Sequence, residues 1–161
     1  MRRVLSILLA PVVLQAPSMM AQEPSLVGVW EIVELVNWSA SGEATRPYGD
    51  DPLGYFVYTP DGHLILHITA NPPLPAAKLP PSVDELATWA RSSIAYFGTY
   101  TVDREAGVIT HEIVGDLFPN RVGTSQVRPY RVEGDELILD FTASSGRRFV
   151  RKLRRIERLQ N

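Results

Sequence analysis

The chain has 161 residues, of which 16 are basic and 18 are acidic, and it contains no cysteine. A chain of this length typically forms one domain around a single hydrophobic core. The lack of cysteine excludes disulfides, thiolate metal sites, a cysteine nucleophile and an N-terminal cysteine that carries a lipid.

The first 21 residues have the pattern of a secretory signal peptide. Two arginines precede an apolar stretch at 4–16, which is too short to span a bilayer, and Ala21 offers a small residue for cleavage. An apolar N-terminal strand is the alternative interpretation of this stretch. We expect residues 1–21 to be removed and residues 22–161 to form a single exported domain, periplasmic or secreted.

Beyond that segment, turn signals and alternating apolar residues predict about eight short strands. The stretch at 26–38 is strand-like, and the loop at 42–54 is rich in glycine, proline and aspartate. Gly62, in a Pro-Asp-Gly turn, suits the left-handed position of a three-residue hairpin loop. The remaining strands are predicted at 55–59, 63–69, 99–103, 107–115, 124–133, 136–143 and 147–153.

One helix is predicted between the early and the late strands, over 82–97. Ser82 and Glu85 match a capping box, in which each side chain accepts a hydrogen bond from a free backbone N–H at the helix start. Gly98 is suited to end the helix. A stripe at helical spacing contains Val83, Leu86, Ala90, Ile94 and Phe97, and a second face, with Trp89, Ser93 and Tyr96, is a candidate lid over a barrel mouth.

Together these elements predict an all-β fold, an eight-stranded antiparallel barrel with one helix inserted between the early and late strands. Closure of eight strands removes exposed sheet edges and leaves room for one small ligand. A two-sheet sandwich is the alternative architecture.

Strand alternation places several polar side chains on faces that should point inward. His111 shares a face with Ile109 and Ile113, and Arg128 shares a face with Gln126 and Tyr130. A buried arginine is costly unless it is paired or hydrogen-bonded. We therefore expect an internal polar site.

Two interpretations of this site remain open. Arg128, with the Tyr130 hydroxyl nearby, binds a ligand carboxylate or polarised carbonyl, or it forms an internal ion pair with Glu34, if alternation from Trp30 places Glu34 inside. His111 is a hydrogen-bonded core residue, or it is a ligand partner or general base.

No metal or cofactor is expected. His63 and His67 are about 13 Å apart along one strand, which is too far to share an ion. The basic segment at 147–158 is interpreted as the solvated face of a last strand. Its contact with a membrane surface or nucleic acid is disfavoured, because the rest of the chain is acidic and repels a polyanion.

Several motifs of the chain resemble those of the bacterial and fungal lipocalin-like domain family. They are LVGVWEIVE, PLGYFVYTPDGHL, YFGTYTVD and THEIVGDLFPNRVGT, and the resemblance covers about residues 26–155. It implies an eight-stranded barrel in which Trp30 closes one end under Arg151 or Arg154, through a cation–π contact. Arg121 stands where an aromatic residue is usual, and Glu34 where a small polar residue is usual.

The leading functional prediction is the binding or carriage of a small, mainly apolar or amphipathic molecule with a polar or anionic end. The alternative is an isomerase, cyclase or hydrolase in which His111 is the base and Arg128 stabilises an oxyanion. A role through protein interaction alone is the third hypothesis. The predicted ligand-binding residues are Glu34, Tyr100, His111, Asn120, Gln126, Arg128 and Tyr130.

Overall fold

The computed structural model describes residues 25–74 and 79–156, so the predicted signal segment lies outside the described residues. The described chain is built almost entirely of β-strands, with one α-helix and one short 3₁₀-helix. The elements are β1 (Gly28–Trp38), β2 (Ala44–Thr45), β3 (Leu53–Tyr58), β4 (His63–Thr69), α1 (Val83–Arg91), β5 (Ser93–Asp103), β6 (Val108–Asp116), η1 (Pro119–Arg121), β7 (Ser125–Glu133), β8 (Glu136–Thr142) and β9 (Arg148–Arg155).

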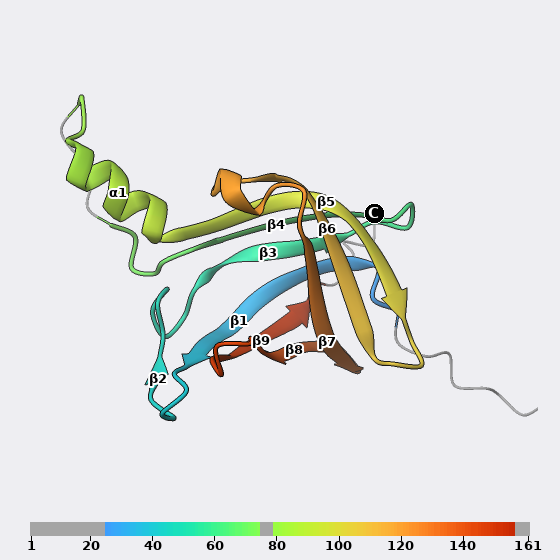
Figure 1. Cartoon of the computed structure of the whole chain (residues 1–161). Coiled ribbons are helices and arrows are strands. Elements are labelled where there is room, and N and C mark those ends of the chain that lie inside the picture. Colours follow the sequence, from blue (N-terminus) through green and yellow to red (C-terminus); the bar gives the residue numbers. More distant parts are fainter. Residues whose placement is uncertain (1–24, 75–78, 157–161) are drawn as a thin grey trace, which may run out of the picture.

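Eight of the strands close into an antiparallel barrel (Figure 1). Each of β3 to β9 pairs with its neighbour in sequence, and β9 pairs back with β1. The two-residue β2 pairs only with the end of β1. The predicted barrel, with its helix between β4 and β5, is therefore confirmed, and the β1–β9 pairing rules out the alternative sandwich.

The helix is shorter than the sequence pattern predicts. Ser82 caps it as expected, and the capping box with Glu85 is formed, but the helix ends at Arg91. The following residues belong to β5, because Ile94 and its inward-facing neighbours pair with the apolar strand β4. Gly98, predicted to end the helix, lies within β5, where a Cβ atom would sit 1.9 Å from the Glu112 carbonyl oxygen.

Helix α1 lies outside the barrel wall. Figure 1 shows it at the far end of the β4–β5 extension, and none of its residues is buried. It therefore does not form the predicted lid over the barrel. No helix in the described part of the chain is long and apolar enough to cross a bilayer.

A β-bulge in β1 changes which side chains face inward. The register against β9 shifts between Ile32 and Glu34. An extra residue reverses the alternation that follows it. Trp30 and Ile32 therefore face the core before the bulge, while Leu35 and Asn37 face inward after it. Glu34 is turned to the outside of the barrel.

Trp30 closes one end of the barrel, as the family resemblance implies. Its side chain is fully buried, and its indole N–H donates to the Leu26 carbonyl at 2.8 Å. The basic side chain over its ring is Arg155, at 4.0 Å from the ring centroid, and not Arg151 or Arg154 as predicted. The reason is register: Arg155 lies directly opposite Trp30, whereas Arg154 faces outward and pairs with Glu31.

The core is one buried apolar cluster that extends from Trp30 over the inward faces of most strands. Strand β7 differs from the other seven strands of the barrel, because none of its residues is fully buried. Its inward face includes Gln126, Arg128 and Tyr130, which are all partly buried. This strand therefore brings polar side chains to the interior, beside a core that the other strands supply.

Candidate functional site

A pocket of about 630 Å³ opens at the end of the barrel away from Trp30. At strands β1 and β9 the pocket begins at the paired residues Asn37 and Phe149. Asn37 is seven residues along β1 from Trp30, which closes the other end of the barrel. Its volume lies within the range of small-molecule sites. It is lined by Asn37, Tyr48, Ile94, Arg121, Gln126, Val127, Arg128, Pro129, Phe141, Thr142, Ala143, Phe149 and Arg151.

Arg128 reaches this pocket from β7. Its guanidinium carbon lies 4.0 Å above the centre of the Phe141 ring, and its Nη2 donates to the Gln126 Oε1 at 2.8 Å. Nη1 donates to the Val127 carbonyl at 3.0 Å. Burial lowers the pKa of Arg128 from its usual value, and the nearby Tyr96 and Tyr58 partly offset that effect. The ring and the amide hold the guanidinium in one orientation.

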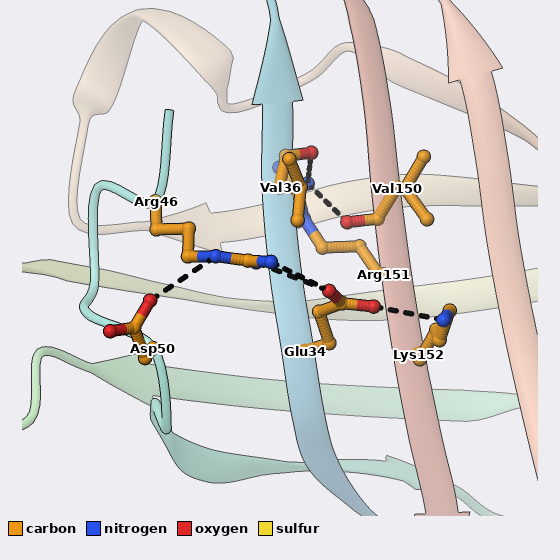
Figure 2. A network of polar contacts seen from close by, with 7 residues as sticks. All are labelled: Glu34, Val36, Arg46, Asp50, Val150, Arg151 and Lys152. Atoms are coloured by element: carbon orange, nitrogen blue, oxygen red, sulfur yellow. Dashed lines mark hydrogen bonds and ion pairs between the residues drawn. The ribbon is translucent and has the colours of Figure 1, made fainter. Parts of the chain in front are cut away.

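Arg151 is the second arginine of the pocket and comes from β9. Its Nη1 donates to the Val36 carbonyl at 3.2 Å and to the Val150 carbonyl at 2.9 Å (Figure 2). Burial lowers the pKa of Arg151 to about 10, and the positive charge of Arg128 acts in the same direction. The side chain stays protonated at neutral pH.

Arg121, the third arginine, is already neutralised. It comes from η1, and its Nη2 donates to Asp116 Oδ1 at 2.9 Å. The Arg121 Nε also lies 2.9 Å from the Asp116 Oδ2. These two atoms form an ion-pair contact but no hydrogen bond, because their geometry is not aligned for one. The Asp116 side chain has no exposed surface, so this pair is a fixed part of the rim.

The pocket therefore carries two uncompensated positive charges. Within residues 25–74 and 79–156, no carboxylate forms an ion pair with Arg128 or Arg151. The Asn37 Oδ1 atom is also buried there without a hydrogen-bond partner among the described residues, but it is an acceptor and is therefore not satisfied by an anion. A buried charge without a partner is costly, and an anion in the pocket relieves that cost.

Glu34, the predicted partner of Arg128, takes part in a different network. It lies on the outside of the barrel, with Arg46 Nη2 at 3.1 Å and Lys152 Nζ at 2.9 Å (Figure 2). These two cations lower the pKa of Glu34 despite its partial burial. The predicted internal ion pair is therefore wrong, because the β1 bulge turns this carboxylate away from Arg128.

His111 is a sealed core residue. It has no exposed surface, and its two ring nitrogens bond the hydroxyls of Tyr58 (Nε2, 3.0 Å) and Tyr96 (Nδ1, 2.8 Å). A neutral imidazole satisfies both tyrosines, donating to one and accepting from the other. Burial, assisted by the charge of Arg128, lowers the pKa of His111 to about 3. His111, the candidate base of the alternative prediction, is not among the residues that line the pocket.

The structure divides the predicted site residues between several places. Arg128 and Gln126 line the open pocket. Tyr100 and Tyr130 instead line a pocket of about 100 Å³ next to Leu26, at the closed end. Inward-facing residues on one strand are about 7 Å apart, so a shared face does not imply a shared pocket. Asn120 is exposed on η1, outside the lining of the open pocket.

Sequence reasoning did not predict as pocket residues Arg151, Tyr48, Asn37 and the stacked pair Phe141 and Phe149. Those two rings lie 5.0 Å apart at an interplanar angle of 15°. For Phe149 and Arg151 a signal was present in the alternation of the last strand, where Phe149, Arg151 and Leu153 share a face. The arginine-rich composition of that strand instead favoured a solvated interpretation.

The fold and the pocket define a class of protein, a closed eight-stranded barrel with a pocket that contains basic side chains at its open end. The lipocalin-like domain family matches residues 27–155, and the chain belongs to this family. The family expected from the sequence motifs is thereby confirmed. Barrels of this kind generally bind small molecules, often hydrophobic ones.

A search of curated proteins gives no match. Among solved structures, a redesigned β-barrel is similar to this chain. The two share 14% sequence identity at a TM-score of 0.42, over 82% of this chain and 92% of the redesigned barrel.

Proposed function

We propose that this protein binds or carries a small, mainly apolar molecule whose anionic end contacts Arg128 and Arg151. The observation that carries this proposal is the pair of partly buried guanidinium groups that face one pocket without an acidic partner in the described chain. A guanidinium presents parallel N–H donors that suit the two oxygens of a carboxylate. The proposal extends to export of the mature domain, on the strength of the signal-like residues 1–21.

The rest of the pocket suits the apolar part of such a molecule. Its apolar lining includes Ile94, Pro129, Phe141, Ala143 and Phe149. The buried cluster around Trp30 already occupies the closed part of the barrel. A compact molecule is therefore favoured over a long alkyl chain.

Carriage is favoured over catalysis. The hydrogen-bonded and fully buried state of His111 keeps this residue from the ligand. The charged groups of the pocket are arginines, which stay protonated at neutral pH and do not serve as general bases.

Native mass spectrometry of the protein purified from its own host tests this proposal. We expect a bound small molecule in the unmodified protein and its loss from the Arg128→Gln and Arg151→Gln variants. Arg131→Gln is the matched control, because Arg131 is on the same strand as Arg128 but is 54% exposed and pairs with Glu133. A bound molecule that is retained in all three variants contradicts the proposal, and a molecule that is chemically converted during incubation favours an enzyme.

A further inference from the structure

We infer that the ligand of this pocket carries two negative charges, one for each of the guanidinium groups of Arg128 and Arg151. This inference rests on the proposed function and makes it more specific. It is based on a count of the charges that line the pocket and on the N–H groups that their present contacts leave for a ligand.

The charge count gives an excess of two. Arg121, Arg128 and Arg151 are the cations of the lining, and Asp116 pairs with the first of them. Glu34, which the sequence predicted as the partner of Arg128, instead forms ion pairs with Arg46 and Lys152 on the outer face of the barrel. A ligand with one negative charge leaves one guanidinium uncompensated in a partly buried site, whereas a dianion compensates both.

Both guanidinium groups are held by contacts that leave donors for a ligand. The described hydrogen bonds of Arg151 all come from Nη1, so its Nε and Nη2 edge makes none of them. Arg128 uses one hydrogen bond from each terminal nitrogen, and Tyr96 is a further hydrogen-bond partner of its side chain, which leaves some of its five N–H groups for a ligand. These unengaged N–H groups give each arginine its own capacity for acidic oxygens.

Two stacked phenylalanines join the two arginines. Arg128 lies over Phe141, Phe141 stacks on Phe149, and the Arg151 guanidinium carbon is 5.6 Å from the centre of the Phe149 ring. The faces of both rings are thus occupied by each other and by cations, so they serve to position the guanidinium groups. The acidic part of the ligand therefore lies beside this stacked column and is not inserted into it.

Isothermal titration calorimetry of the mature domain at pH 8 tests the inference with three probes that share a phenyl group. Phenylsuccinate has two carboxylates, 3-phenylpropanoate has one, and phenyl phosphate has a single doubly charged head. We expect phenylsuccinate, phenyl phosphate or both to bind at least about tenfold more tightly than 3-phenylpropanoate, because a second charge-assisted contact is formed.

Variants assign this preference to the two arginines. We expect Arg128→Gln and Arg151→Gln each to reduce the preference to within about threefold, and Arg131→Gln to retain it. Arg128→Lys keeps the charge and serves where the Gln variant does not fold; it should retain part of the preference. A preference for phenyl phosphate alone indicates one shared doubly charged group, and a preference for phenylsuccinate alone indicates two separate acids.

Two outcomes overturn the inference and are distinguishable. Equal affinity for the singly and doubly charged probes, with loss of binding in the arginine variants, contradicts the dianion but leaves the proposed function standing. Binding that is absent for all three probes, or that is unchanged in both Gln variants, contradicts the proposed function and the inference together.

Discussion

The buried hydrogen-bonded histidine predicts that this protein loses stability in mild acid. The pKa of His111 is about 3 in the folded protein, because the ring is buried and near Arg128. In the unfolded chain it returns to about 6.5. The folded state therefore binds fewer protons than the unfolded state between these two values, and the stability present above pH 6.5 is lost as the pH falls toward 3.

The size of this loss of stability follows from the difference between the pKa values of His111 in the folded and unfolded states. Each pH unit below 6.5 costs up to about 1.4 kcal/mol, so the free energy of unfolding should fall by about 2 kcal/mol between pH 7.5 and pH 5. Glu34 and Asp140, whose pKa values are lowered by their cationic partners, lose their stabilising effect below about pH 4.5. The decrease in the free energy of unfolding between pH 7.5 and pH 5 is therefore attributed to His111.

Urea unfolding at several pH values measures this effect. The variant His111→Gln keeps a donor and an acceptor for the two tyrosines but does not titrate. It should be less stable at pH 7.5, because the amide does not reproduce the bonds from Tyr58 and Tyr96. Its free energy of unfolding should nevertheless stay nearly flat down to pH 5. Parallel pH curves for the variant and the unmodified protein refute the reasoning.

Three further predictions concern the arginines and the N-terminus. Arg128→Met should raise the free energy of unfolding of the ligand-free protein by about 1 kcal/mol while it abolishes anion binding, since it removes an unpaired buried charge; a loss of stability measured by urea unfolding argues against an unpaired charge. Arg155→Ala should cost about 0.5–2 kcal/mol and shift the Trp30 fluorescence to the red, whereas Arg154→Ala, on the outer face, should change stability by less than about 1 kcal/mol. Intact-mass measurement on protein from the native host should show loss of residues 1–21, and a cytoplasmic protein that retains them contradicts export.

The barrel was predictable from the sequence because several strands, such as β4 and β7, have a regular alternation and several hairpins have a recognisable turn. Gly62, for example, adopts the left-handed backbone expected of it, with a φ of 86°. The capping box at Ser82 was equally predictable, since both partners are three residues apart. These features are local, and local sequence determines them.

The wrong predictions concern features that are determined by tertiary contacts. Ile94 continues a helical stripe in the sequence, but pairing with Ile68 makes it part of a strand. Alternation from Trp30 predicts that Glu34 faces inward, but the β1 bulge before it turns its side chain outward, and no local sequence signal marks this bulge. Tyr130 shares a face with Arg128, yet the two line different pockets. Alternation gives the direction of a side chain, and it does not give its depth in the barrel.

A crystal structure of the protein purified with its natural ligand tests the central claim most directly. The account predicts a small molecule in the pocket at the open end, with acidic oxygens within about 3 Å of the guanidinium nitrogens of both Arg128 and Arg151. A ligand bound elsewhere on the barrel, or one whose uncharged end contacts these two arginines, contradicts it.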